Sequence, residues 1–147
     1  MTPAPIALSC GEPAGIGPEL AGAAWSALGA AVPFFWIGEP SHLPGDVAHV
    51  LIDAPHEAAE AARRALPVLP LAMPGPRAPG VPQAEQAQGV IDAIERGVAL
   101  VRSGDASALC TLPIHKQALA DGAGFAFPGH TEFLCHLAGA DEVVMML

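Results

Sequence analysis

Three short stretches of this sequence place polar side chains directly after a predicted strand, where ligands collect in parallel α/β sheets. The third of them, Pro128-Gly129-His130-Thr131-Glu132, presents an imidazole and a hydroxyl at the predicted start of a helix. Both His130 and Thr131 can hydrogen-bond to a polar, anionic substrate. The same pattern is also typical of a helix N-cap, in which Thr131 caps the helix and His130 has no role in binding. The spacing alone leaves both interpretations open.

The second stretch, Thr111-Leu112-Pro113-Ile114-His115-Lys116, places a histidine and the single lysine of the chain just past a predicted strand. Both His115 and Lys116 can bind a phosphate or a carboxylate at a helix N-terminus. The alternative is a solvent-facing lysine beside a histidine that caps the following helix. Taken by itself, the pattern favours this alternative.

The first stretch is a glycine-rich turn, Gly11-Glu12-Pro13-Ala14-Gly15-Ile16-Gly17-Pro18-Glu19, between a predicted strand and a predicted helix. Its glycines do not follow the spacing of a dinucleotide fingerprint, and no Gly-Lys-Ser/Thr of a phosphate-binding loop follows them. Glycine lets a backbone pass close to a ligand or adopt a positive φ. The candidates for a loop that lines a cofactor or substrate crevice are Gly11, Glu12, Gly15 and Gly17. A tight strand-to-helix turn without a ligand explains the pattern equally well.

The remaining histidines do not form a metal-binding pattern. Chelating pairs on a helix need spacings of three or four residues, whereas His130 and His136 are six apart, and prolines or a glycine interrupt the segment that holds His42, His49 and His56. We therefore predict that no metal site is complete within this chain. The three cysteines lie far apart without a Cys-x-x-Cys pair, and they are predicted to be reduced, half-buried thiols.

The composition excludes several classes of protein. Hydrophobic residues make up 52% of the 147 residues and charged residues 14%, which predicts a folded domain with a core. The net charge of −9 leaves no basic surface for nucleic acid or for an anionic membrane. The first residues lack the basic start of a signal peptide, and no apolar stretch approaches the roughly 20 residues of a membrane span. A cytoplasmic protein is predicted.

Apolar runs alternate with amphipathic segments along the chain. The clearest helix covers residues 83–102, where apolar side chains recur every three or four residues. The other predicted helices are 18–28, 57–66, 114–120 and 130–137, and the predicted strands are 6–9, 34–37, 50–52, 68–71, 108–111 and 142–147. This alternation predicts an α/β fold, a layered and mostly parallel sheet flanked by helices.

Further expectations concern the connections and the organisation of the chain. Segment 73–82 is rich in proline and is predicted to be an ordered surface connection. Glu60 and Arg64 are spaced to form a charge pair on their helix. Because the chain stops on the buried-type strand 142–147, the fold is expected to be incomplete at the C-terminus. Residues 1–120 are assigned to the N-terminal part of a first α/β domain and residues 121–147 to the start of a second.

Taken together, four stretches resemble the 4-hydroxythreonine-4-phosphate dehydrogenase family, often called PdxA. In chain order the matching stretches are Gly11 to Glu19, Pro113-Ile114-His115-Lys116, Phe127-Pro128-Gly129-His130-Thr131-Glu132-Phe133 and Val143-Val144-Met145-Met146-Leu147. The glycine-rich turn is also similar to the corresponding turn of isopropylmalate and isocitrate dehydrogenases, whose fold the family shares. The resemblance therefore implies an isocitrate/isopropylmalate dehydrogenase-like fold.

The resemblance also implies a reaction. Members of the family oxidise 4-phosphooxy-L-threonine with NAD or NADP, and the resulting β-keto acid loses CO2 to give 3-amino-2-oxopropyl phosphate. A divalent metal ion (zinc, magnesium or cobalt) polarises the substrate oxygen. The family's substrate-contacting His and Thr fall on His130 and Thr131. The implied protein is a cytoplasmic homodimer with its active site in the cleft between two α/β domains.

Two features depart from the family pattern. The family's chains are more than twice as long, and their three metal-binding histidines and most of their NAD contacts follow the segment matched by residues 143–147. The metal ligands are therefore expected outside this chain, and the isolated chain is expected to be inactive. The second departure is Thr111-Leu112-Pro113, where the family commonly has Thr-Gly-Pro, which would change how closely the backbone approaches a ligand.

Two other functions fit the same motifs. One is a related dehydrogenase that acts on a phosphorylated four-carbon sugar acid, such as a threonate or erythronate phosphate. The other is a non-catalytic, substrate-binding remnant that keeps the His130 and Thr131 site without the metal and cofactor halves.

Overall fold

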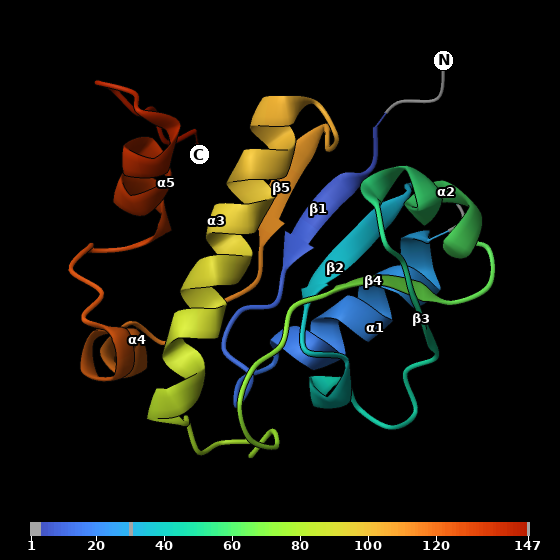
Figure 1. Ribbon diagram of the computed structural model, residues 1–147, viewed down its shortest axis with the longest axis horizontal. Coiled ribbons are helices and arrows are strands. Elements are labelled where there is room, and N and C mark those ends of the chain that lie inside the picture. Colours follow the sequence, from blue (N-terminus) through green and yellow to red (C-terminus); the bar gives the residue numbers. More distant parts are fainter. Residues whose placement is uncertain (1–3, 30, 147) are drawn as a thin grey trace.

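The computed structural model describes residues 4–29 and 31–146, which form a five-stranded parallel sheet with helices packed against it (Figure 1). The strands lie in the order β3-β4-β2-β1-β5, and every neighbouring pair is parallel. Their bounds are Ile6–Ser9 for β1, Phe34–Gly38 for β2, His49–Leu51 for β3, Leu66–Pro70 for β4 and Ala108–Thr111 for β5. The predicted α/β fold with a parallel sheet is confirmed.

The helices follow the strands in the alternation that the sequence predicts. They are α1 (Gly17–Leu28), α2 (Ala58–Ala61), α3 (Ala87–Ser103), α4 (Lys116–Ala123) and α5 (His130–Ala138). Three single 3-10 turns precede or separate them, namely η1 (Pro40–His42), η2 (Pro55–Glu57) and η3 (Ala84–Gln86). The helix predicted at 83–102 is therefore η3 followed by α3.

The two long helices α1 and α3 cover opposite faces of the sheet. Successive residues of a strand point to opposite faces, and on β5 Leu109 packs closely against Gly97 of α3. The next residue, Cys110, lines an apolar groove together with Ala24 and Leu28 of α1. The three inner strands β1, β2 and β4 carry continuous apolar runs because both of their faces are covered, whereas the edge strands β3 and β5 are partly exposed.

A second hydrophobic cluster lies outside α3, where α4 and α5 pack against it (Figure 1). Three phenyl rings form its centre, with centroids 5.0 to 5.5 Å apart. They belong to Phe125, Phe127 and Phe133. The C-terminus of α5 is also fixed by Arg102, which donates hydrogen bonds to the carbonyls of Leu137 and Ala138. Residues 125–138 therefore share a core with α3.

The helix predicted at 57–66 is wrong in its second half. Regular α-helix ends at Ala61, and β4 begins at Leu66. Pro67 disfavours the α-helical conformation of the residue before it, and Leu66 is fully buried in the sheet beside His49. Glu60 pairs with Arg63, with 3.5 Å between carboxylate and guanidinium, instead of the predicted Arg64, because the chain tightens into turns after α2.

The strand predicted at 142–147 is also wrong over residues 142–146, and Leu147 lies outside the described residues. Val144 and Met146 are about nine-tenths exposed, at 88% and 93%. A strand needs a neighbouring strand for its backbone hydrogen bonds, and no strand of the described chain pairs with this segment.

The proline-rich connection 73–82 is ordered, as predicted. His42 is buried and its Nε2 lies 3.0 Å from the carbonyl oxygen of Gly75. The side-chain amide of Gln86 donates to the carbonyls of Pro74 and Pro76, each at 3.1 Å. Because proline has no N–H group, these side chains fix a segment that cannot join the sheet.

Candidate functional site

The structure brings two of the three predicted stretches together at the carboxyl ends of β1 and β5. The N–H of Glu12 donates to the carbonyl oxygen of Pro113 at 2.9 Å. Gly11 has a φ of 68°, and a Cβ there would lie 2.6 Å from that same oxygen. Glycine is therefore required at position 11 by its backbone conformation and by the close approach of the second stretch.

The glycine-rich turn is held by its own backbone and by one buried carboxylate. Glu12, only 7% exposed, accepts the N–H of Ala14 at 3.0 Å through Oε1. The carbonyl of Glu12 accepts the N–H of Gly15, also at 3.0 Å. A Cβ at Gly17 would lie 2.5 Å from the carbonyl oxygen of Cys10. These contacts correspond to the tight-turn interpretation, in which Glu12 and Gly17 stabilise the turn itself.

His115 is the N-cap of α4. Its Nδ1 accepts the N–H of Ala118 at 3.1 Å, so a neutral His115 carries its proton on Nε2. Both His115 and Lys116 are exposed. The cap therefore leaves the second imidazole nitrogen as a potential donor next to the only lysine, at the positive end of a helix dipole.

His130 and Thr131 lie in the first turn of α5, and the N-cap of this helix is Gly129 without a side-chain capping bond. The alternative in which Thr131 caps the helix is therefore wrong. His130 is half-buried, and its Nε2 is buried without a hydrogen-bond partner among the described residues. A buried polar atom without a partner is costly unless a ligand or water satisfies it.

The third stretch is separate from the other two. In Figure 1, α5 packs along the outer side of α3, whereas the turn between β1 and α1 lies at the tips of the strands. Within the described ranges, no hydrogen bond joins His130 or Thr131 to residues 11–17 or 111–116. The described residues thus hold two separate groups of candidate contacts, one at the tips of β1 and β5 with the N-terminus of α4, the other at the N-terminus of α5.

Burial lowers the pKa of His130 below its usual 6.5, because desolvation disfavours the charged imidazolium. Between the lowered pKa and 6.5 the unfolded chain binds more protons than the folded chain, so stability rises with pH across this window. The buried, neutral His130 contributes its full share to the free energy of unfolding above pH 6.5, and this share is lost as the pH falls through the lowered pKa. We expect the free energy of unfolding to fall more steeply between pH 7 and pH 5 in the wild type than in His130→Asn.

The measurement is urea unfolding at several pH values. His56→Asn is the matched control, since His56 is exposed in the short turn η2, and it should keep the wild-type slope. Equal slopes for wild type and His130→Asn would mean that the folded environment of His130 does not affect its protonation.

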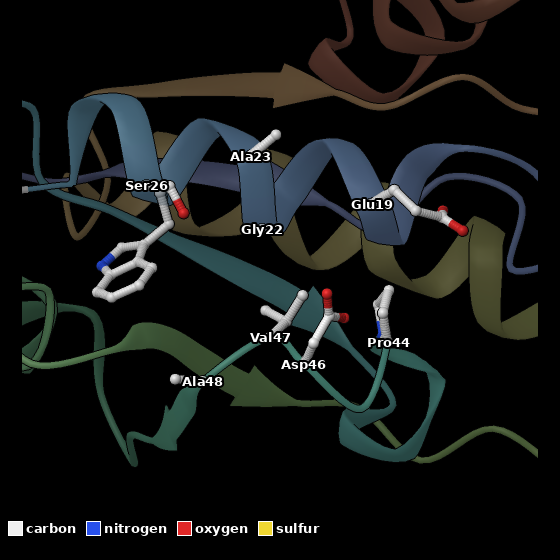
Figure 2. Close-up of a pocket in the computed structure, with 9 residues that line it drawn as sticks. Glu19, Gly22, Ala23, Ser26, Pro44, Asp46, Val47 and Ala48 are labelled. Atoms are coloured by element: carbon white, nitrogen blue, oxygen red, sulfur yellow. The ribbon is translucent and has the colours of Figure 1, made fainter.

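A cavity of about 310 Å³ lies between α1 and the segment 44–48 (Figure 2). The carboxylates of Glu19 and Asp46 line it together with Ser26 and Trp25. Of the described residues that line this cavity, none is a predicted site residue. Like charges repel, so we do not place a phosphorylated substrate there.

One residue that contacts the candidate site is absent from the sequence-based predictions. Arg77, in the proline-rich connection, donates to the carbonyls of Pro13 and Gly15 and pairs with Glu19. Its side chain is 11% exposed. In the sequence, Arg77 stands out only as a lone arginine among prolines. This pattern does not identify its partners, which lie more than fifty residues away in the chain.

The described residues offer no group of three or more His, Cys, Asp or Glu side chains that could hold a metal ion. They do not fit the divalent metal that the family resemblance implies, so no step through a metal can be derived from them. No described helix is both long and apolar enough to cross a membrane. The three cysteines are free thiols, and burial raises the pKa of Cys10 to about 12, whereas Cys110 is exposed.

Known proteins match this chain along most of its length. Residues 32–147 match the family model described as pyridoxal phosphate biosynthetic protein PdxA. A 4-hydroxythreonine-4-phosphate dehydrogenase of Ruegeria sp. (strain TM1040) is 59% identical over 100% of this chain and 46% of its own length. The enzyme of the same name from Roseobacter denitrificans is 52% identical over 98% of this chain and 44% of its own. The chain thus spans less than half the length of these curated relatives.

Solved structures agree with the sequence matches. A 4-hydroxythreonine-4-phosphate dehydrogenase of Klebsiella pneumoniae has a TM-score of 0.80 at 32% identity, over 92% of this chain and 44% of the other. The enzyme from Burkholderia phymatum has a TM-score of 0.83 at 29% identity, over 97% of this chain and 46% of the other. The parallel sheet, the order of the motifs and these matches agree, and the chain belongs to the PdxA family of pyridoxal phosphate biosynthetic proteins.

Proposed function

We propose that the complete protein carrying this chain is a 4-hydroxythreonine-4-phosphate dehydrogenase. It would oxidise 4-phosphooxy-L-threonine with NAD or NADP to a β-keto acid that decarboxylates to 3-amino-2-oxopropyl phosphate. The observation that carries the proposal is His130, whose buried Nε2 has no partner among the described residues and which stands in the motif shared with the family. A substrate oxygen would satisfy this nitrogen.

His130 and Thr131 are proposed to bind the substrate. At neutral pH the burial that lowers the pKa of His130 favours a neutral imidazole, which donates a hydrogen bond through one nitrogen and accepts through the other. The hydroxyl of Thr131 adds a second contact from the same turn of α5. A neutral His130 can accept a hydrogen bond from a substrate hydroxyl, whereas an imidazolium can only donate.

His115 and Lys116 are proposed as contacts to the phosphate. Both are exposed at the N-terminus of α4, where peptide N–H groups and the helix dipole favour an anion. The turn made by Gly11, Glu12, Gly15 and Gly17 would line the same cleft, with Glu12 holding its shape. The chain is otherwise strongly acidic, so these local donors are what an anionic substrate can use.

The remaining parts of the active site are proposed to lie outside the described residues. These are the ligands of a zinc, magnesium or cobalt ion and most contacts to NAD or NADP. We also propose a cytoplasmic homodimer, with residues 1–120 in a first α/β domain and residues 121–147 beginning a second. The boundary of this division falls within α4, and α5 would be the first complete helix of the second domain.

The proposal is tested by assaying the complete protein for reduction of NAD and of NADP with 4-phosphooxy-L-threonine. Parallel assays contain zinc, magnesium or cobalt. A four-carbon sugar acid phosphate, such as 4-phosphoerythronate, serves as the comparison substrate. Preference for the threonine derivative supports the proposal, preference for the sugar acid assigns the related dehydrogenase activity, and binding without turnover of either assigns a binding protein.

A further inference from the structure

The proline-rich connection 73–82 crosses the glycine-rich turn and reaches it with a nearly buried arginine. Arg77 Nε donates to the carbonyl oxygen of Pro13 at 2.7 Å, and Nη2 donates to that of Gly15 at 3.2 Å. Nη2 also pairs with the carboxylate of Glu19. One guanidinium thus joins two carbonyls of the turn and the first turn of α1, a fork geometry that lysine cannot reproduce.

The proline-rich connection also binds the carbonyl of Ala14, which lies between those of Pro13 and Gly15. The N–H of Gly80 donates to the carbonyl oxygen of Ala14 at 2.8 Å. Three consecutive carbonyls, at residues 13, 14 and 15, are therefore held from the same side. Since the peptide unit is planar, fixing each carbonyl also fixes the direction of the next N–H, at residues 14, 15 and 16.

On its other side the turn supports the second predicted stretch. The N–H of Glu12 holds the carbonyl of Pro113, two residues before the N-cap of α4. A shift of the turn would therefore shift Pro113 and the residues that follow it. Arg77 therefore influences, through the turn, the position of the N-terminus of α4, which carries His115 and Lys116.

Arg77 is itself held on a fixed base. His42 and Gln86 bind the carbonyls of residues 74 to 76 directly before it. The charge of the guanidinium is balanced by Glu19, and the hydrogen bond from Arg77 lowers the pKa of that carboxyl below its usual value. The Glu19 carboxylate is about half exposed, so the carbonyl contacts of Arg77, more than this ion pair, hold the turn.

We infer that Arg77 is a positioning residue of the proposed dehydrogenase. It sets the glycine-rich turn, and through Glu12 and Pro113 it sets the place of His115 and Lys116 at the phosphate. This inference rests on the proposed function and adds to it a residue that touches neither substrate nor cofactor. It predicts that loss of Arg77 weakens substrate binding more than it slows turnover.

The test compares Arg77→Ala and Arg77→Lys in the complete protein, with steady-state kinetics on the phosphorylated substrate. We expect Arg77→Ala to raise KM about tenfold with kcat within about twofold of wild type, because uniform binding is lost. Arg77→Lys should lie between, since its ammonium keeps the charge near Glu19 without bridging both carbonyls. Arg96→Ala is the matched control, because Arg96 is also half-buried and donates to a single proline carbonyl, that of Pro70. It should keep the wild-type KM.

A KM for Arg77→Ala equal to that of Arg96→Ala would overturn the inference. It would also be overturned if kcat fell by the same factor in Arg77→Ala and in Arg96→Ala. If Arg77→Ala does not fold, Arg77→Lys decides, and an unchanged KM for it also overturns the inference. A wild type without turnover defeats the proposed function instead. In that case faster amide exchange at residues 14–16 in Arg77→Lys than in Arg96→Ala supports the positioning of the turn, and equal exchange rejects it.

Discussion

Replacing Gly11 by alanine is expected to lower the free energy of unfolding by about 3 kcal/mol, the sum of backbone strain and overpacking. The φ of 68° at Gly11 is unfavourable for alanine, and the added Cβ would lie 2.6 Å from the carbonyl oxygen of Pro113 and 2.9 Å from Cβ of Leu112. Backbone cannot move aside as a flexible side chain can. The turn and the stretch 111–116 should therefore separate.

The control for Gly11→Ala is Gly104→Ala. Gly104 is the C-cap of α3, with a φ of 86° and no atom within 4 Å of an added Cβ. Gly104→Ala introduces a side chain at the same left-handed conformation but without the clash, so it should lower the free energy of unfolding by only about 1 kcal/mol. Urea unfolding of the complete protein measures both. Equal losses in the two variants would show that the contact with Pro113 contributes nothing beyond the backbone conformation.

Replacing His130 by alanine is expected to lower kcat/KM at least tenfold, about 1.4 kcal/mol of transition-state stabilisation. The imidazole is half-buried at the start of α5, and its Nε2 lacks a partner in the described chain, so removal takes away a preformed contact. Thr131→Val should lower kcat/KM by a smaller factor, because it removes one hydroxyl and keeps the shape. Steady-state kinetics of the complete protein measure both.

His56→Ala provides the control for His130→Ala, since it removes an exposed imidazole far from the three motifs in sequence. Its kcat/KM should equal that of the wild type. A wild-type value for His130→Ala as well would assign His130 to the packing of α5. Thermal melting of each variant separates loss of folded protein from loss of binding.

Much of the fold can be predicted from this sequence because its strands are continuous apolar runs ended by glycine or proline. The runs at Ile6–Ser9 and Ala108–Thr111 are strands with the predicted bounds, since each pairs with a neighbour over its whole length. Segment 57–66 fails because local helix periodicity competes with Pro67 and with pairing of β4 to β2 and β3. Pairing between distant strands outweighs local propensity there.

The candidate site is less predictable than the fold. The motifs identify His130 and Thr131 by type and order, but the sequence does not reveal that Gly129 rather than Thr131 is the N-cap. Arg77 cannot be predicted from local pattern, because its carbonyl partner Pro13 lies 64 positions earlier. Contacts of this kind depend on how the connection crosses the turn, which only the folded arrangement determines.

The pairing of β1 with β5 has a consequence for the order of folding. β1 is an interior strand of the sheet, yet one of its two neighbours begins only at Ala108. The Ser107 side chain also bonds to the carbonyl of Pro5, 102 positions earlier in the chain. Contacts this distant in sequence form after local helices, because closing a long loop costs entropy first. Substitutions at Gly11 should therefore act mainly on the unfolding rate, whereas substitutions inside α3 should also slow folding. During synthesis, β1 can pair with β5 only after most of this chain has been made, so one edge of β1 stays uncovered until then.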